Sequence, residues 1–156
     1  MMANQSQHIE IERKFLVTSD AYKALATRHY SIVQGYIAKG NGRTVRVRIR
    51  DNQAFLTIKG GLLEGQRLAR FEWEKEISVA DARELLQLAL PGLIEKTRWI
   101  VPASGDLFWE IDEFHGRLEG RTLAEIELDH ENRSFDIPPF IGEEVTGQPE
   151  YYNANM

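Results

Sequence analysis

Hydrophobic and charged residues alternate along much of the chain with a repeat of two. The stretch HIEIERKFLV, residues 8–17, places Glu10 and Glu12 on alternate positions with Ile9 and Ile11. Successive side chains of a β-strand point to opposite faces, so residues two apart share a face. This stretch therefore predicts a strand with one apolar face and one face that carries two carboxylates and the ammonium of Lys14.

The same alternation recurs in later segments and predicts several more strands. RTVRVRIR at residues 43–50 is followed by the short turn DNQ and then by AFLTIKG, so these two strands should form a hairpin. Five further strand candidates are SIVQGYIA (31–38), RFEWEKEIS (70–78), EKTRWIV (95–101), DLFWEIDEF (106–114) and RTLAEIEL (121–128).

Two short helices are expected between these strands. Ser19 is a candidate N-cap for a helix at residues 20–28, and residues 79–90 have helical spacing that stops before Pro91. From residue 136 onward the chain contains IPPF and QPEYYN, and it is expected to be irregular. The pattern predicts a single α+β domain, residues 1–156, that is mainly antiparallel β and folds as a barrel or a sandwich.

The charged faces of the predicted strands are grouped by sign. Arg46, Arg48 and Arg50 share one face, whereas Glu72 and Glu74 share another. A solvated outer face is the usual explanation for alternation. Arginines about 7 Å apart repel each other unless negative charge faces them, and arginine suits forked recognition of phosphate oxygens. We therefore interpret the set as a closed barrel with a polar, water-filled interior, whose apolar outside is covered by the helices and the tail.

Composition narrows the chemistry further. The 156 residues carry a net charge of −5, which disfavours general nucleic-acid binding, and no apolar run approaches the roughly 20 residues of a membrane span. The first residues, MMANQSQH, lack the apolar segment of a signal peptide, so a cytoplasmic protein is expected. There is no cysteine and the four histidines are scattered, so a metal would be held by carboxylates, which favours Mg²⁺ or Mn²⁺.

The segment IEIERKFLV resembles the ExExK signature of the CYTH, or triphosphate tunnel metalloenzyme, superfamily. The resemblance continues in order through GYIA, RVRIR, FLTIKG, RFEWEKEI, EKTR, FWEID, LAEIEL, EEVTG and YYN, and it covers residues 9–153. It is strongest to the short bacterial inorganic tripolyphosphatases. It implies a closed eight-stranded antiparallel β-barrel with a few flanking helices, a tunnel that acts on triphosphates with Mg²⁺ or Mn²⁺.

Position by position, the resemblance also implies roles for individual residues. The implied metal ligands are Glu10, Glu12, Glu125 and Glu127. The implied triphosphate-binding residues are Lys14, Arg48, Arg50, Lys96 and Arg98, and the same row extends to Arg46. An acidic lining, where a second metal or the attacking water would sit, comprises Glu72, Glu74, Glu110 and Asp112. Tyr36 and Lys59 match a proposed catalytic pair, in which the tyrosine orients a lysine neutral enough to take a proton from water.

Simpler roles remain open for several of these residues. Lys59 would serve equally well as an ordinary triphosphate-binding cation, although neighbouring arginines are expected to lower its pKa, as a lysine base requires. Tyr36 would also fit as a packed aromatic, and Glu10 and Glu12 would form salt bridges to arginines across an empty tunnel. In this group a basic residue usually precedes YYN, but here Glu150 stands there, which would either weaken a contact that closes the tunnel or alter which substrate tail fits.

The favoured function is the metal-dependent hydrolysis of inorganic tripolyphosphate, a small-molecule substrate, without nucleic acid or membrane as partner. The alternatives of the same superfamily are a thiamine triphosphatase, a nucleoside triphosphatase and an adenylate cyclase. The alternative that is not an enzyme is a module that binds polyphosphate or a nucleotide without turnover. The full set of expected metal ligands disfavours that module, because binding alone would tolerate their loss.

Overall fold

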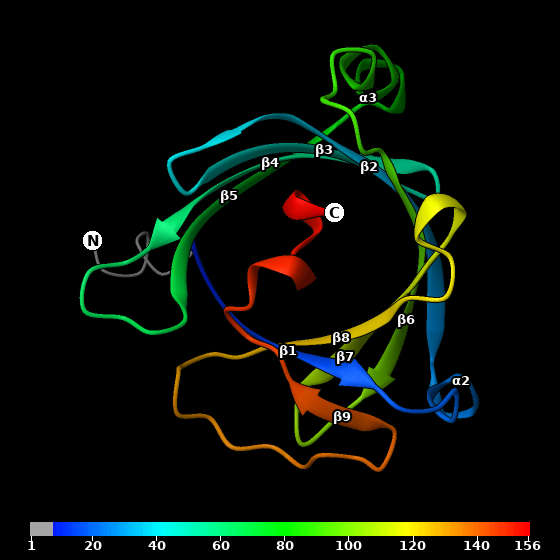
Figure 1. Cartoon of the computed structure of the whole chain (residues 1–156), viewed down its shortest axis with the longest axis vertical. Coiled ribbons are helices and arrows are strands. Elements are labelled where there is room, and N and C mark those ends of the chain that lie inside the picture. Colours follow the sequence, from blue (N-terminus) through cyan, green and yellow to red (C-terminus); the bar gives the residue numbers. More distant parts are fainter. Residues whose placement is uncertain (1–7) are drawn as a thin grey trace.

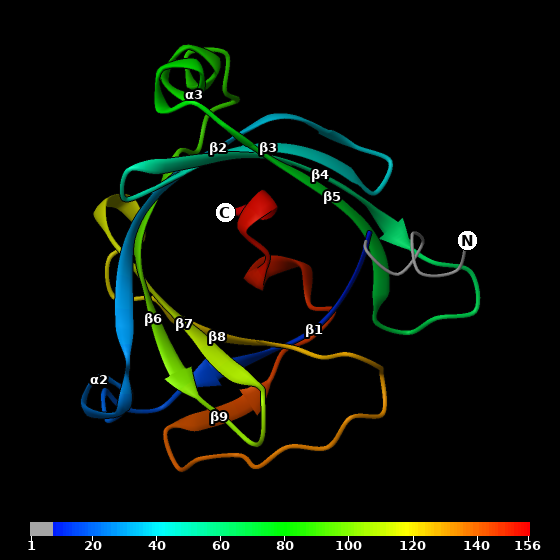
Figure 2. The same cartoon turned by 180° about the vertical axis from the view of Figure 1, so that it is seen from behind.

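The computed structural model describes residues 8–156, and its main feature is a closed barrel of eight antiparallel strands (Figure 1). The hydrogen-bonded order is β5-β4-β3-β2-β6-β7-β8-β1, and an additional pairing of β5 with β1 closes the ring. A ninth strand, β9, pairs with the free edge of β1 and lies outside the ring (Figures 1 and 2). The barrel expected from the alternating pattern is therefore confirmed.

Every predicted strand is present, with longer bounds in several cases. The strands are β1 Ile9–Val17, β2 Arg28–Gly40, β3 Arg43–Arg50, β4 Gln53–Leu62, β5 Ala69–Ile77, β6 Ile94–Pro102, β7 Phe108–Phe114, β8 Thr122–Glu127 and β9 Ile141–Glu144. β3 and β4 form the expected hairpin, with Arg50 opposite Gln53. The ninth strand was not expected, because only four residues of the tail take part in it.

The two helices are shorter than predicted. α2 is Tyr22–Leu25, and Ala21 rather than Ser19 stands at its N-cap position without a side-chain hydrogen bond. It ends early because the backbone N–H of Thr27 donates to the carbonyl oxygen of Ile100 (2.9 Å), which draws the chain into β2. α3 is Val79–Leu86 and is capped by the Ser78 hydroxyl. It stops before Leu90, whose backbone N–H donates to the carbonyl oxygen of Tyr36 on β2 (2.8 Å).

The apolar faces of the strands point outward and are covered in two places. On β7 and β8, Trp109 and Ile126 are fully buried and pack in one cluster with Phe140 of the segment that precedes β9. On the opposite side of the ring, α3 covers Val47 of β3 with Ala82. The expected covering of the outer face by helices and tail is thus found for these strands.

The prediction that the tail covers the outside of the barrel is wrong for its last residues. They run inside the ring (Figures 1 and 2). After β9 the chain forms two short 3₁₀ helices, η2 Pro149–Tyr151 and η3 Asn153–Asn155. The Lys14 ammonium donates to the carbonyl oxygen of Tyr151 (3.0 Å) and lies over the ring of Tyr152. The cations of the interior attract these polar groups and so hold this segment inside the barrel.

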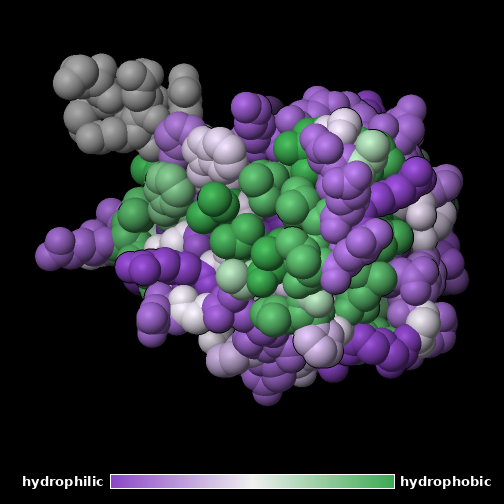
Figure 3. All heavy atoms as spheres, turned by 90° about the horizontal axis from the view of Figure 1, so that it is seen from above, coloured by the Kyte–Doolittle hydropathy of each residue, from purple (hydrophilic) through white to green (hydrophobic). Residues whose placement is uncertain are grey.

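Part of the outer surface stays apolar and open to solvent. Figure 3 shows hydrophobic side chains gathered on one face of the molecule. Exposed apolar residues on the outer faces of β1, β4 and β5 include Ile9, Ile58 and Phe71. Between residues 8 and 156, none of the helices has the length and apolar character that crossing a membrane demands.

Candidate active site

The inside of the barrel contains a cavity of about 590 Å³, to which all eight strands of the ring contribute side chains. Almost every residue that the sequence nominated lies in its wall, because the charged face of each strand points inward. The exception is Asp112, which lies behind the wall among buried cations.

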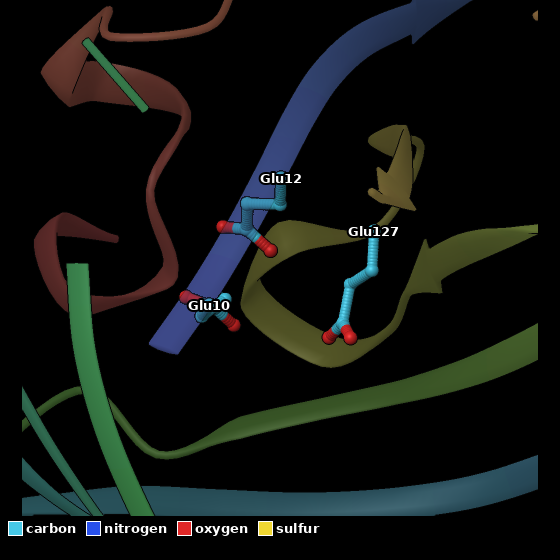
Figure 4. Close-up of side chains that lie close together, drawn as sticks. All are labelled: Glu10, Glu12 and Glu127. Atoms are coloured by element: carbon cyan, nitrogen blue, oxygen red, sulfur yellow. The ribbon is translucent and has the colours of Figure 1, made fainter. Parts of the chain in front are cut away.

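Three carboxylates converge on one side of the cavity (Figure 4). Glu10 and Glu12 come from β1, and Glu127 comes from β8, where it lies opposite Glu12 in the strand register. One carboxylate oxygen from each of the three lies within 4.8 Å of the other two. Oxygen atoms of glutamates at this spacing fit a hard divalent cation.

Burial and mutual repulsion raise the pKa values of Glu12 and Glu127. Burial, together with the charges of Glu125 and Glu10, raises the pKa of Glu12 well above its usual value. Burial and the charges of Glu110 and Glu10 raise the pKa of Glu127 to about 8. A divalent cation would relieve this repulsion, so the three glutamates suit a metal in charge as well as in geometry.

Glu125, the fourth expected ligand, is paired differently. Its carboxylate lies 3.7 Å from the Lys14 ammonium and 3.9 Å from the Arg98 guanidinium. Burial would raise its pKa, but Lys14, a hydrogen bond with Glu12 and Arg98 together hold the pKa of Glu125 well below its usual value. Glu125 therefore connects the acidic cluster to Lys14 and Arg98.

Arg98 and Lys96 are the cations that contact Asp112. The guanidinium of Arg98 donates two hydrogen bonds to the Asp112 carboxylate (2.8 and 2.9 Å), and the Lys96 ammonium lies 2.8 Å from it. Despite burial, these cations hold the pKa of Asp112 below its usual value. We had expected Asp112 in the acidic lining of the tunnel. The structure corrects this, because its carboxylate is fully engaged as a counter-ion outside the cavity wall.

The remaining basic residues differ in how far they are neutralised. Burial and the charges of Arg46 and Arg98 lower the pKa of Arg48 to about 9. Burial, with Arg98 and Arg48, lowers the pKa of Lys96 to about 7 although Asp112 works against this. Arg50 instead lies over the rings of Tyr30 and Phe55, at 4.6 and 5.1 Å from their centroids.

The expected catalytic pair is brought into the cavity wall but is not connected. The Lys59 ammonium donates to both oxygens of Glu10 (2.9 and 3.0 Å) and lies 3.7 Å from Glu72. Burial works to lower the pKa of Lys59, but the charges of Glu12 and Glu10 outweigh it and raise that pKa. The prediction that neighbouring arginines lower the pKa of Lys59 is therefore wrong for the protein without bound metal or substrate. Across residues 8–156, no hydrogen bond joins Tyr36 to Lys59.

The sequence of this barrel matches a known protein family. A model of the CYTH domain matches residues 8–154 of the chain. The chain belongs to the CYTH family. An inorganic triphosphatase of Acetivibrio thermocellus is 45% identical over 148 residues, which cover 94% of this chain and 92% of that protein. An inorganic triphosphatase of Nitrosomonas europaea is 33% identical over 150 residues, covering 94% and 95%.

The fold comparison agrees with the family assignment. The crystal structure of an inorganic triphosphatase superposes on this CYTH barrel with a TM-score of 0.65 at 31% identity, and the match covers 94% of this chain and 92% of the other. The Glu150 side chain, which departs from the pattern expected before YYN, is exposed and lies outside the cavity wall of this CYTH protein.

Several polar residues in or next to the CYTH tunnel were given no role from the sequence, among them Arg70, Gln34 and Asn153. Arg70 lies opposite Glu10 in the strand register and lines the cavity. Gln34 is fully buried and bonds to Arg48, and Asn153 bonds to Lys96. Alternation with Tyr36 already places Gln34 on the inner face of β2. No periodic signal marks Asn153, because the irregular tail brings it into the tunnel.

Proposed function

We propose that this CYTH protein hydrolyses inorganic tripolyphosphate in the presence of Mg²⁺ or Mn²⁺. One observation carries the proposal: a closed tunnel in which three converging glutamates face a wall of buried cations. The two relatives named above as inorganic triphosphatases support the substrate class. Phosphoryl transfer asks a protein mainly for positioning and charge neutralisation, and this wall offers both.

Glu10, Glu12 and Glu127 are the proposed metal ligands, with Glu125 adjoining them through Glu12. One oxygen from each of Glu10, Glu12 and Glu127 lies within 4.8 Å of the other two, and burial and neighbouring carboxylates raise the pKa values of Glu12 and Glu127. A bound cation would supply positive charge for the phosphoryl oxygens and for the attacking water. Glu72 lies next to this cluster. Burial and the charge of Glu10 raise its pKa to about 7, which suits an acidic lining residue.

Six basic residues are the proposed grip on the triphosphate. Lys14, Arg46, Lys96 and Arg98 are all less than 9% exposed, so their charges act in a medium that screens them weakly. Arg48 and Arg50 continue this set along β3, on the same face as Arg46. Guanidinium groups bind phosphoryl oxygens through two parallel hydrogen bonds, which fixes the orientation of the chain of phosphates.

Lys59 and Tyr36 are the proposed catalytic pair. The Lys59 ammonium binds Glu10 of the acidic cluster (2.9 Å), and Arg46 of the basic set lies near enough for its charge to act on Lys59. Tyr36 lies opposite Arg46 in the strand register and points into the same cavity. Lys59 is charged while Glu10 holds it, so it must give up a proton before it accepts one from water.

The test is phosphate release from tripolyphosphate, ATP and thiamine triphosphate, each with Mg²⁺, with Mn²⁺ and with EDTA. Metal-dependent release from tripolyphosphate, well above release from the other two, is the expected result. Faster turnover of ATP or thiamine triphosphate would make this an organic triphosphatase, and a cyclic product from ATP would make it a cyclase. Tight binding of all three without turnover would leave only a binding module.

A further inference from the structure

Two amide side chains, the buried Gln34 and the partly buried Asn153, connect two cations in the wall of the tunnel. The side-chain oxygen of Asn153 accepts hydrogen bonds from the Lys96 ammonium (2.7 Å) and from the Gln34 amide nitrogen (3.0 Å). The side-chain oxygen of Gln34 in turn accepts from the Arg48 guanidinium (2.8 Å). Gln34 is 0% exposed and Lys96 is 2% exposed, so water does not substitute for these contacts.

The orientation of both amides follows from the two cations. Lys96 and Arg48 carry only donors, so each must face an oxygen atom. The Asn153 oxygen therefore faces Lys96, and the Gln34 oxygen faces Arg48. This leaves the Gln34 amide nitrogen to donate to the second lone pair of the Asn153 oxygen. The chain of hydrogen bonds from Lys96 to Arg48 is thereby complete.

The two amides hold these cations without adding negative charge to them, although the Asp112 carboxylate already lies 2.8 Å from the Lys96 ammonium. Arg98, their neighbour, has Asp112, Glu110 and Glu125 within 4.0 Å. Arg48, by contrast, has no carboxylate within 4.0 Å among residues 8–156, and its side-chain hydrogen bond goes to Gln34. A carboxylate in place of either amide would compete with a polyanion for the same cations, whereas a neutral oxygen fixes their position and leaves the charge available.

We propose that Gln34 and Asn153 are positioning residues, which hold Arg48 and Lys96 in place for the phosphoryl oxygens and add no negative charge beyond the Asp112 carboxylate that already faces Lys96. The inference rests on the proposed function, because it concerns the cations assigned to tripolyphosphate. It also gives the C-terminal segment a part in the site. Asn153 lies 119 residues from Gln34 in the chain and reaches it only because η3 lies inside the barrel.

The decisive variant is Asn153→Asp. An aspartate keeps an oxygen acceptor for both Lys96 and Gln34 and changes only the charge, because among residues 8–156 the Asn153 amide nitrogen has no hydrogen-bond partner to lose. We expect KM for tripolyphosphate to rise about 10-fold, since the carboxylate cancels charge next to the substrate. We expect kcat to change less than about 3-fold, and Tm to stay at or above that of the wild type.

Two further variants separate positioning from packing. Asn153→Leu and Gln34→Met keep most of the volume but remove the acceptors, so KM should rise and Tm should fall. Asn132→Asp makes the same chemical change as the decisive variant at an exposed loop position, and it should leave both quantities unchanged. A KM for Asn153→Asp equal to that of the wild type would overturn the proposal, because a purely structural asparagine tolerates an isosteric acceptor.

A binding measurement distinguishes failure of this inference from failure of the proposed function. Tripolyphosphate in EDTA should raise the Tm of the wild type, and the rise should be smaller for Asn153→Asp. If the wild type shows the rise but releases no phosphate with either metal, the proposed function fails and the positioning role is supported. If the Tm rise is equal in the two proteins, or is missing in both, the positioning role fails.

Discussion

Carboxyl groups on two sides of the tunnel have pKa values that are shifted in opposite directions. At the acidic cluster, Glu12 and Glu127 have raised pKa values because burial and neighbouring carboxylates act on them together. Around Arg98, the carboxylates of Asp112 and Glu125 have lowered pKa values because buried cations outweigh the cost of burial. Identical side chains therefore differ through the charges that the fold places around them.

In the acidic cluster the carboxylates repel one another, whereas around Arg98 the carboxylates and cations neutralise one another. Within residues 8–156, Glu10 is the one glutamate of the cluster with a cation within 4.0 Å, the Lys59 ammonium at 2.9 Å. Asp112 alone has two cations at 2.8 Å. A divalent cation would therefore stabilise the first region and add little to the second. Substitutions should act in opposite directions on stability in the two regions.

Breaking the balanced region should have the largest effect. Asp112→Ala leaves Arg98 and Lys96 buried without their shared acceptor, so we expect the free energy of unfolding to fall by about 3–5 kcal/mol. Urea denaturation at pH 7 measures this. Asp106→Ala removes the exposed partner of Arg133, whose loss should change stability far less. An equal loss of unfolding free energy in the two variants would show that the buried ion pairs of Asp112 stabilise the fold no more than an exposed pair does.

Removing charge from the acidic cluster should abolish activity without unfolding the protein. Glu12→Gln removes a proposed metal ligand, and we expect metal-dependent turnover to fall by at least about 100-fold. In EDTA its Tm should match or exceed that of the wild type, because a repelled carboxylate is gone. Glu143→Gln, at an exposed position of β9, is the control. Full activity of Glu12→Gln would refute the metal-site assignment.

Lys59 joins the two regions, and its substitution tests the catalytic pair. Lys59→Met should lower kcat by about 10- to 100-fold while changing KM by less than about 3-fold. The exposed Lys75→Met, on the outer face of β5, should leave both constants unchanged. Steady-state kinetics on tripolyphosphate give the answer. A raised KM with normal kcat would instead make Lys59 a substrate-binding cation.

The smallest expected effect is the pH dependence of stability without metal. Glu127 has a pKa of about 8 in the folded protein, above the roughly 4.3 of an unfolded chain. Its stabilising contribution is therefore complete below about pH 4 and is lost as pH rises through 8. Protein surrounds the side chain of Glu127, but the tunnel leaves it open to solvent, so we expect solvent to screen part of this effect.

Comparison with Glu127→Gln isolates this contribution from that of Lys96, which titrates in the same range. In EDTA the two proteins should have similar Tm values at pH 5. At pH 8.5 the wild type should be lower by a difference on the order of 2 °C, and Mg²⁺ should remove that difference by stabilising the wild type. A wild type that becomes more stable relative to the variant as pH rises would contradict the raised pKa.

Much of the site could be read from the sequence because strand alternation has a fixed period. Once Glu10 and Glu12 share a face, the closed barrel places that face inward with those of Arg48 and Lys96. The pairing between faces could not be read in this way. Lys59 was expected among arginines, yet it binds Glu10, because β1 and β4 lie on either side of β5 in the closed ring.

The sequence by itself determined the strands, the polar interior of the barrel and the residues that line it, because a two-residue repeat dictates local side-chain direction. The tertiary structure decided which charges are neighbours and hence which carboxylates are raised or lowered in pKa. It also decided that the tail enters the tunnel, where Asn153 meets Lys96. These outcomes depend on long-range distances in a weakly screening interior, and no local pattern in a chain encodes such distances.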